Sequence, residues 1–182
     1  MTRPTGLNVD VPTDLLAACY RDTRAVLAAI PAGRWAAPSP CREWTVREVA
    51  DHLVDGLGYF AAAVRGEQAD RPADLLAAYD DVTRRCLAAF ADPAALAAEH
   101  PFGDGTMPGR SIATISLSEA LVHGWDLATA TDLPYAPNPD AVALLARFAG
   151  GPKVEGLFAD PVPVPADAPP FVALLGRLGR VA

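Results

Sequence analysis

The sequence predicts an all-α protein, built as a bundle of four long helices in a single domain that spans residues 1–182. Four long segments repeat apolar residues at helical spacing, and stretches rich in proline and glycine separate them. No segment alternates apolar and polar residues between hairpin turns. Hydrophobic residues make up 51% of the chain and charged residues 20%, which provides material for a core and argues against disorder.

The first helix is expected over residues 10–30, where Pro12 suits a first turn. Several prolines and a glycine then interrupt the helical pattern. The second helix begins at Thr45, because Thr45-Val46-Arg47-Glu48 matches a capping box, in which the Thr45 side chain and the Glu48 side chain bond to each other's backbone amides. Trp44 comes directly before this cap, where it can pack against the helix as a staple or wedge.

The rest of the chain divides in the same way, by helical periodicity and by the positions of proline and glycine. We expect a helix over residues 72–91, a loop over 99–109 and a long helix over 110–130. A shorter helix over 139–149, an irregular proline-rich tail over 152–170 and a last helical turn or two over 171–180 follow.

Composition excludes several classes of function. The net charge is −7 and no basic cluster occurs, so nucleic acid is a poor partner. No run approaches the roughly 18 apolar residues of a membrane span. The N-terminus lacks the apolar region of a signal peptide, so we expect a cytoplasmic protein. The three cysteines, Cys19, Cys41 and Cys86, form no C-x-x-C pair and indicate neither a disulfide framework nor a zinc ribbon.

A candidate metal site comes from the spacing of Glu119 and His123 in the fourth long helix. Residues four apart share one face of a helix, so this carboxylate and this imidazole can hold one divalent metal between them. His52, on the second helix, is the candidate third ligand, because facing helices of a bundle bring ligands together. Two histidines and one carboxylate with open positions suit zinc, nickel or iron(II).

The same residues permit a second interpretation. Glu119 and His123 lie in a stripe that should face the core, and an ionised carboxylate there must be paired or coordinated. A buried hydrogen-bonded pair of Glu119 with a histidine, without any metal, satisfies that requirement equally well. The spacing by itself leaves both interpretations open.

Three further residues have weaker assignments. Asp126, three residues after His123, can accept a hydrogen bond from the second nitrogen of a ligand histidine and so fix its tautomer. His100 falls in the loop before a proline and is expected to be exposed. Cys41 is disfavoured as a nucleophile, because the acidic neighbour Glu43 does not lower a thiol pKa.

These residues occur in strings that resemble a known family. The segment Cys41-Arg42-Glu43-Trp44-Thr45-Val46-Arg47-Glu48, followed by His52, resembles the W-T-V-x-x-x-x-x-H element of the DinB-like superfamily, nearest to the branch that contains mycothiol-dependent maleylpyruvate isomerase. Glu119-x-x-x-His123-x-x-Asp126-Leu127 resembles the second metal element of that branch. The string at 123–128 and the tail at 161–167 are similar to short, uncharacterised actinobacterial members.

The resemblance implies an up-up-down-down four-helix bundle with a metal at one end, held by His52, Glu119 and His123. It implies zinc or nickel as the metal and mycothiol or bacillithiol as a thiol cosubstrate, and many members of the family dimerise. The isomerase carries an additional C-terminal domain that supplies catalytic contacts. This chain is too short to contain that domain, so the resemblance supports the metal site more strongly than maleylpyruvate isomerisation.

Three functions follow as hypotheses. The first is a thiol-dependent metalloenzyme, in which a metal-bound thiolate attacks a small electrophile for conjugation or isomerisation. The second is a metal-binding or interaction module without catalysis. The third is a structural bundle, as a monomer or a dimer, in which the carboxylate and the histidines only bond to each other.

Overall fold

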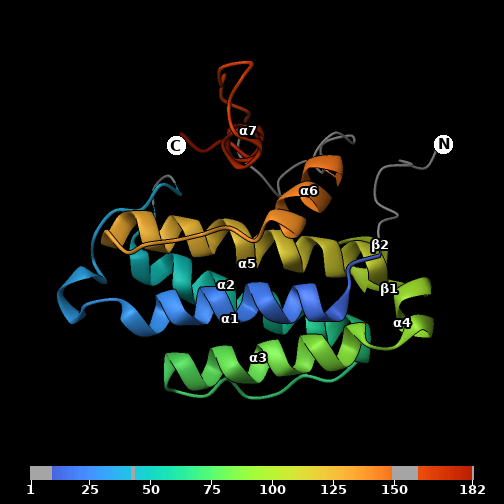
Figure 1. Ribbon diagram of the computed structural model, residues 1–182. Helices are drawn as coiled ribbons and strands as arrows, with labels where there is room; N and C mark the ends of the chain where they lie inside the picture. Colours follow the sequence, from blue (N-terminus) through green and yellow to red (C-terminus); the bar gives the residue numbers. More distant parts are fainter. Residues whose placement is uncertain (1–9, 42–43, 149–159, 182) are drawn as a thin grey trace.

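The computed structural model describes residues 10–41, 44–148 and 160–181 of the chain (Figure 1). Helices dominate this part, and a small two-stranded sheet interrupts them. The elements are α1 (Thr13–Ala29), a short 3₁₀ turn (Ala32–Arg34), α2 (Val46–Arg65), α3 (Leu75–Phe90), α4 (Pro93–Ala97), β1 (Glu99–Phe102), β2 (Gly105–Pro108), α5 (Gly109–Thr131), α6 (Pro139–Phe148) and α7 (Pro170–Arg177).

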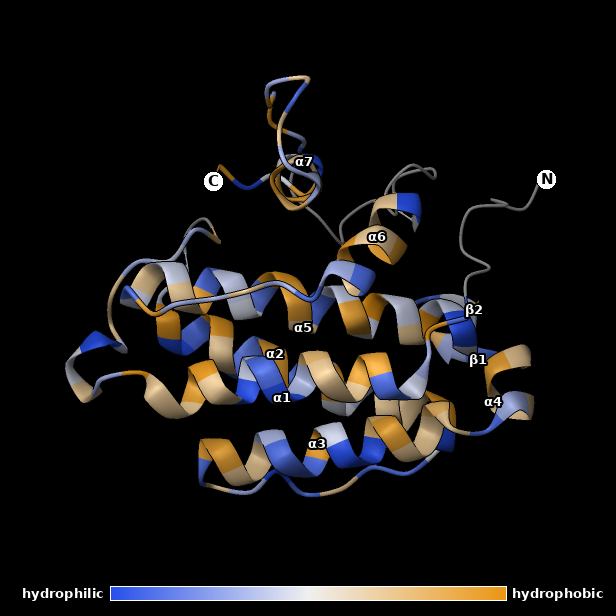
Figure 2. Ribbon diagram, viewed as in Figure 1, coloured by the Kyte–Doolittle hydropathy of each residue, from blue (hydrophilic) through white to orange (hydrophobic). Residues whose placement is uncertain are grey.

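The four long helices α1, α2, α3 and α5 form the predicted all-α bundle. Helix α5 packs against both α1 and α2, and α3 packs against the same two helices on the other side. Figure 2 shows hydrophilic and hydrophobic residues following each other around α1 and α3, which is typical of helices that turn one face to a core and one to water.

The order of helix directions differs from the expected up-up-down-down. Tyr20 and Thr23 of α1 bond to Ser116 and to the Ala120 carbonyl of α5, so these two helices run in parallel. Figure 1 shows α2 and α3 running the other way, which makes the order up-down-down-up. The reason is the connection at 66–74, which returns along the bundle before α3 begins, so α3 repeats the direction of α2 instead of reversing it.

The segment at 99–109, expected to be a loop, forms the β1–β2 hairpin. Phe102 pairs with Gly105, so only Gly103 and Asp104 make the turn, and Gly103 has a φ of 56° that suits the first position of a tight hairpin turn. The ribbon has only edge strands, so its prolines cost few backbone hydrogen bonds. Strands of four residues are too short to show the alternation by which strands are recognised in a sequence.

N-caps fix the starts of α2 and α3; the start of α2 agrees with the prediction and that of α3 does not. The predicted capping box at Thr45 and Glu48 is formed at the start of α2. Helix α3 begins at Leu75 rather than at Pro72, because the Asp74 side chain accepts a hydrogen bond from the Ala77 amide and acts as the N-cap.

Helix α5 is buried on almost all of its faces and not only along one stripe. Helices α1 and α2 cover two sides of it, and α4, α6 and β2 also pack on it. This placement explains why several serines and threonines and the side chains of Glu119, His123 and Asp126 on α5 are removed from water. Such polar groups require partners within the protein.

The C-terminal part packs over the bundle. Helix α6 contacts α5 and α7. Residues 160–169 are irregular, as the prolines predict, while residue 149 and the part of the predicted tail at 152–159 lie outside the described residues. In the described parts of the chain, every helix is too short or too polar to cross a bilayer.

Gly124 allows a close approach of α5 to α1 and to Tyr135. A Cβ atom at this position would lie 2.7 Å from Thr23 Oγ1 and 3.0 Å from the Tyr135 hydroxyl oxygen. Both oxygens are held by hydrogen bonds to backbone carbonyls of α5, so they cannot simply move aside. We expect Gly124→Ala to lower the free energy of unfolding by about 1–3 kcal/mol, the usual cost of overpacking.

Gly56→Ala is the matched control, because a Cβ atom added at this α2 position meets no atom within 4 Å. This substitution should instead raise the free energy of unfolding by about 0.5–1 kcal/mol through helix propensity. Urea unfolding followed by circular dichroism measures both. Equal effects of the two substitutions would contradict the close packing at Gly124.

Candidate metal centre

The N-terminal part of α2 brings His52 beside Glu119 of α5. The Thr45 amide donates to Glu48 Oε2 at 2.7 Å, and the Glu48 amide donates to Thr45 Oγ1 at 3.3 Å, which fixes the first turn. Trp44 packs beside the helix, with its ring centre 4.6 Å from that of His52. The predicted staple or wedge at Trp44 therefore contacts the candidate site itself.

The three side chains that the sequence singled out converge on one point. His52 Nε2 lies 3.2 Å and His123 Nε2 lies 3.1 Å from the same oxygen, Glu119 Oε2. The two imidazole ring centres are 5.2 Å apart, with the rings nearly perpendicular. One potential ligand atom from each residue lies within 4.8 Å of the others, which is close enough to surround a single ion.

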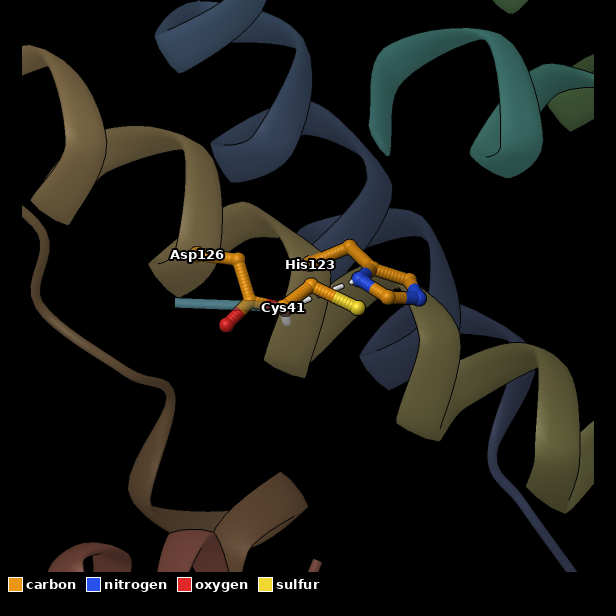
Figure 3. Close-up of side chains that lie close together, drawn as sticks. All are labelled: Cys41, His123 and Asp126. Carbon is orange, nitrogen blue, oxygen red and sulfur yellow. Dashed lines mark hydrogen bonds and ion pairs between the residues drawn. The ribbon is translucent and has the colours of Figure 1, made fainter. Parts of the chain in front are cut away.

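Asp126 contacts His123 on the opposite side of its ring. His123 Nδ1 donates to Asp126 Oδ2 at 2.9 Å, so the predicted hydrogen bond to the second nitrogen is confirmed (Figure 3). With a proton held on Nδ1, the neutral imidazole has its lone pair on Nε2, which faces the Glu119 carboxylate. Two electron-rich atoms then face each other, and a proton or a metal cation must lie between them.

The electrostatics of the metal-free cluster show the same demand for positive charge. Burial alone would raise the pKa of Glu119, but the charge of His123 and hydrogen bonds from His123 and His52 outweigh burial and hold that pKa well below its ordinary value. Burial would lower the pKa of His123, but the Glu119 charge and the hydrogen bond to Asp126 raise it to about 9. Without a metal, the cluster therefore retains a proton at neutral pH.

Exposure divides the cluster into a closed side and an open side. The side chains of His123 and Glu119 are 6% and 9% exposed, whereas that of His52 is 40% exposed. The His52 side of the cluster therefore borders solvent. A purely structural pair buried in a core does not require such an opening.

A second group of potential ligands lies on the far side of His123. Cys41, His123 and Asp126 also offer ligand atoms within 4.8 Å of one another, and Figure 3 shows the Cys41 sulfur beside the His123 ring. Asp126, however, is already paired with Arg180, whose Nη2 lies 3.0 Å from Oδ2. A guanidinium thus supplies the positive charge here, which leaves the Nε2 side of His123 as the better candidate metal centre.

Cys41 has the properties of a thiol rather than a thiolate. Burial raises its pKa, and the nearby Arg180 only partly opposes this effect. This agrees with the expectation that Cys41 is a poor nucleophile, although Glu43, on which that expectation was based, lies outside the described residues.

His100 lies apart from the cluster and is half-buried, so the expectation that it is exposed was wrong. It sits on β1, and its Nε2 lies 2.7 Å from the Ala95 carbonyl oxygen of α4. Arg180 is the residue of the site that sequence reasoning missed. It follows Asp126 by 54 positions, and no local pattern in the sequence connects the two.

Comparison with known proteins identifies the family. The family model for the mycothiol maleylpyruvate isomerase N-terminal domain matches residues 16–128. The chain belongs to this family. The match includes the three candidate ligands and Asp126, whereas Arg180 lies beyond it.

Two curated relatives extend the similarity over most of the chain. They are the uncharacterized proteins MT0763 and Rv0738 from two strains of Mycobacterium tuberculosis, each 34% identical over 165 residues. Each alignment covers 86% of this chain and 90% of the relative. No solved structure matches the chain.

The raised pKa of His123 predicts how stability depends on pH in the metal-free protein. The folded state holds the His123 proton up to a pH of about 9, while the unfolded chain releases it near the ordinary value of 6.5. The stabilising contribution is therefore complete below pH 6.5 and is lost as the pH rises toward 9. Urea unfolding in the presence of a chelator at several pH values between 6 and 9.5 measures this loss.

Glu119→Gln is the control, because it removes the charge that raises the pKa of His123. The buried thiols Cys19 and Cys86 also have raised pKa values and reduce stability at high pH in both proteins. The difference between wild type and Glu119→Gln should isolate the cluster. The same loss of stability in both proteins would show that the pair makes no contribution.

Proposed function

We propose that the protein is a thiol-dependent metalloenzyme whose divalent metal is held by His52, Glu119 and His123. The observation that supports this most directly is the meeting of two imidazole Nε2 atoms at one buried carboxylate oxygen, with one side open to solvent. Zinc is the metal we favour, with nickel and iron(II) as alternatives, because all three accept two histidines and one carboxylate.

The donor set fits such a metal. The Glu119 carboxylate is nearly buried and needs positive charge. The Asp126 carboxylate orients the His123 ring and directs its lone pair toward the cluster, as outer partners of metal-bound histidines commonly do. Three protein ligands leave coordination positions free, which is typical of catalytic rather than structural zinc sites.

A bound metal would lower the pKa of a thiol at the open position and so supply a thiolate nucleophile at neutral pH. The protein's own contribution is orientation and exclusion of water. Trp44 packs on His52, and the body of the bundle closes the site behind Glu119 and His123. A small electrophile would enter on the His52 side.

The family suggests mycothiol as the thiol, and two outcomes of its attack are consistent with the site. In conjugation, the thiol adds across a double bond or opens a strained ring of the electrophile: a carbon–sulfur bond forms as the π bond or ring bond breaks, and the thiol proton ends on the product. In isomerisation, the thiol adds to a double bond, the bond rotates, and the thiol leaves unchanged. We further propose a cytoplasmic location, where low-molecular-weight thiols are kept reduced, and a homodimer, which sedimentation velocity would test.

One observation favours a metal-binding or interaction module without catalysis as the second candidate. Asp126 is the next carboxylate beyond the cluster, and it is already bonded to both His123 and Arg180. It is therefore not free to act as a general acid or base. Thiol binding separates the two candidates, since only the enzyme requires it.

Metal content is the first test. Protein produced without a histidine tag should contain about one zinc, nickel or iron per chain by elemental mass spectrometry, and His123→Ala should contain little, because it loses one of three ligands. His100→Ala is the matched control, since its histidine bonds to α4 away from the cluster, and it should keep the metal. Metal-free wild type, even after loading with zinc and nickel, would remove the enzyme and the metal-binding module and leave only an interaction module.

Thiol binding is the second test. Zinc-loaded wild type should bind mycothiol in isothermal titration calorimetry, whereas the metal-free protein should not, because the metal supplies the attachment point. A metal-loaded protein that ignores millimolar mycothiol would exclude the enzyme and leave the non-catalytic module.

A further inference from the structure

We propose that Arg180 is a positioning residue of the metal centre, which holds Asp126 so that His123 presents its Nε2 atom to the metal. This inference rests on the proposed metal site. It adds a residue from the C-terminal segment, outside the region that the family model matches.

A continuous chain of contacts leads from Arg180 to the candidate ligands. Arg180 Nη2 donates to Asp126 Oδ2 at 3.0 Å, and Arg180 Nε lies 3.4 Å from Asp126 Oδ1. Asp126 Oδ2 in turn accepts the Nδ1 proton of His123 at 2.9 Å. The opposite nitrogen of the same ring lies 3.1 Å from Glu119 Oε2.

The geometry of the Arg180–Asp126 pair fixes the carboxylate as well as neutralising it. The guanidinium contacts both carboxylate oxygens, and such a forked contact holds a carboxylate plane in one orientation. Oδ2 is thereby directed at the His123 ring. Rotation of the carboxylate would break the bond to Nδ1 and free the imidazole to turn.

Burial explains why a partner is needed at this point. The Asp126 side chain is fully buried and that of Arg180 is 7% exposed. Asp126 and Glu119 thus place two carboxylates on either side of one buried imidazole. A buried carboxylate without a compensating partner is strongly unfavourable, so Asp126 can stay beside His123 only while Arg180 is present.

The end of α7 delivers Arg180 to this position. Gly179 has a φ of 80°, and its amide donates to the Gly176 carbonyl at 3.1 Å, while the Arg180 amide donates to the Leu175 carbonyl at 2.9 Å. These two bonds are those of a Schellman motif, which turns the chain sharply after a helix. Arg180 Nη1 also donates to the Leu178 carbonyl at 2.8 Å, so the guanidinium is held by the Leu178 carbonyl as well as by Asp126.

The test compares Arg180→Gln with Arg177→Gln. Arg177 is the last residue of α7, three residues before Arg180. It is exposed, and within the described residues it bonds only to the Ala146 carbonyl, so the control removes the same charge without touching the centre. Zinc affinity is measured by competition with a chromophoric chelator. Arg180→Gln should bind zinc about 10- to 100-fold more weakly than wild type, the usual effect of losing an outer partner. Arg177→Gln should stay within about twofold of wild type.

Arg180→Lys separates charge from geometry. Lysine keeps the positive charge but cannot contact both carboxylate oxygens with one planar group, so we expect partial recovery of zinc affinity. If Arg180→Gln fails to fold, Arg180→Lys takes its place, and a loss of affinity is again expected. Wild-type zinc affinity in every folded Arg180 variant would overturn the proposal.

A readout that needs no metal keeps this proposal distinct from the proposed function. In the metal-free protein labelled with ¹⁵N-histidine, the His123 Nδ1 proton should give a slowly exchanging downfield resonance, assigned by its absence in His123→Asn. It should persist in Arg177→Gln and disappear in Arg180→Gln. Wild type that binds no metal would end the proposed function, yet loss of this resonance in Arg180→Gln would still support Arg180 as the residue that positions His123. Persistence of the resonance in Arg180→Gln would overturn that role.

Discussion

A single buried carboxylate, that of Glu119, sets the requirements that the surrounding structure meets. It lies in the middle of α5, the most buried helix of the bundle, and an ionised group there needs positive charge close by. Two imidazoles supply contacts at 3.1 and 3.2 Å, and both do so through Nε2. The charge of Glu119 can thus be satisfied by a proton or, as we propose, by a metal.

The architecture gives this cluster one accessible side. Helix α5 contributes Glu119 and His123 from within the bundle, whereas α2 contributes His52 from its more exposed face. Trp44, held in place by the segment before α2, covers part of the His52 ring. A carboxylate buried only for stability would be better enclosed, because water weakens the pairing that burial is meant to strengthen. The exposure of His52 is therefore the feature that links the fold to the proposed binding of a small molecule.

Two carboxylates contact opposite nitrogens of the His123 ring. Glu119 faces Nε2 and lies next to the proposed metal, while Asp126 holds Nδ1 and is itself held by Arg180. The spacing of Glu119, His123 and Asp126 along one helix creates the first two contacts. The third depends on where α7 and the residues after it lie, because they bring Arg180 to Asp126.

The sequence by itself determined the long helices and the pairing of Glu119 with His123, because these follow from local rules, whereas the short helix α4 was not predicted. His52 was added because facing helices of a bundle bring ligands together. Helical periodicity, the capping box at Thr45 and the four-residue spacing of Glu119 and His123 depend only on neighbours along the chain. The β1–β2 hairpin was missed, since its strands are too short to alternate visibly. The tertiary structure decided the up-down-down-up order, the exposure of His52 and the contact of Arg180 with Asp126. Each of these depends on how segments far apart in the sequence pack together. Packing of the whole chain, rather than any local preference, determines these contacts.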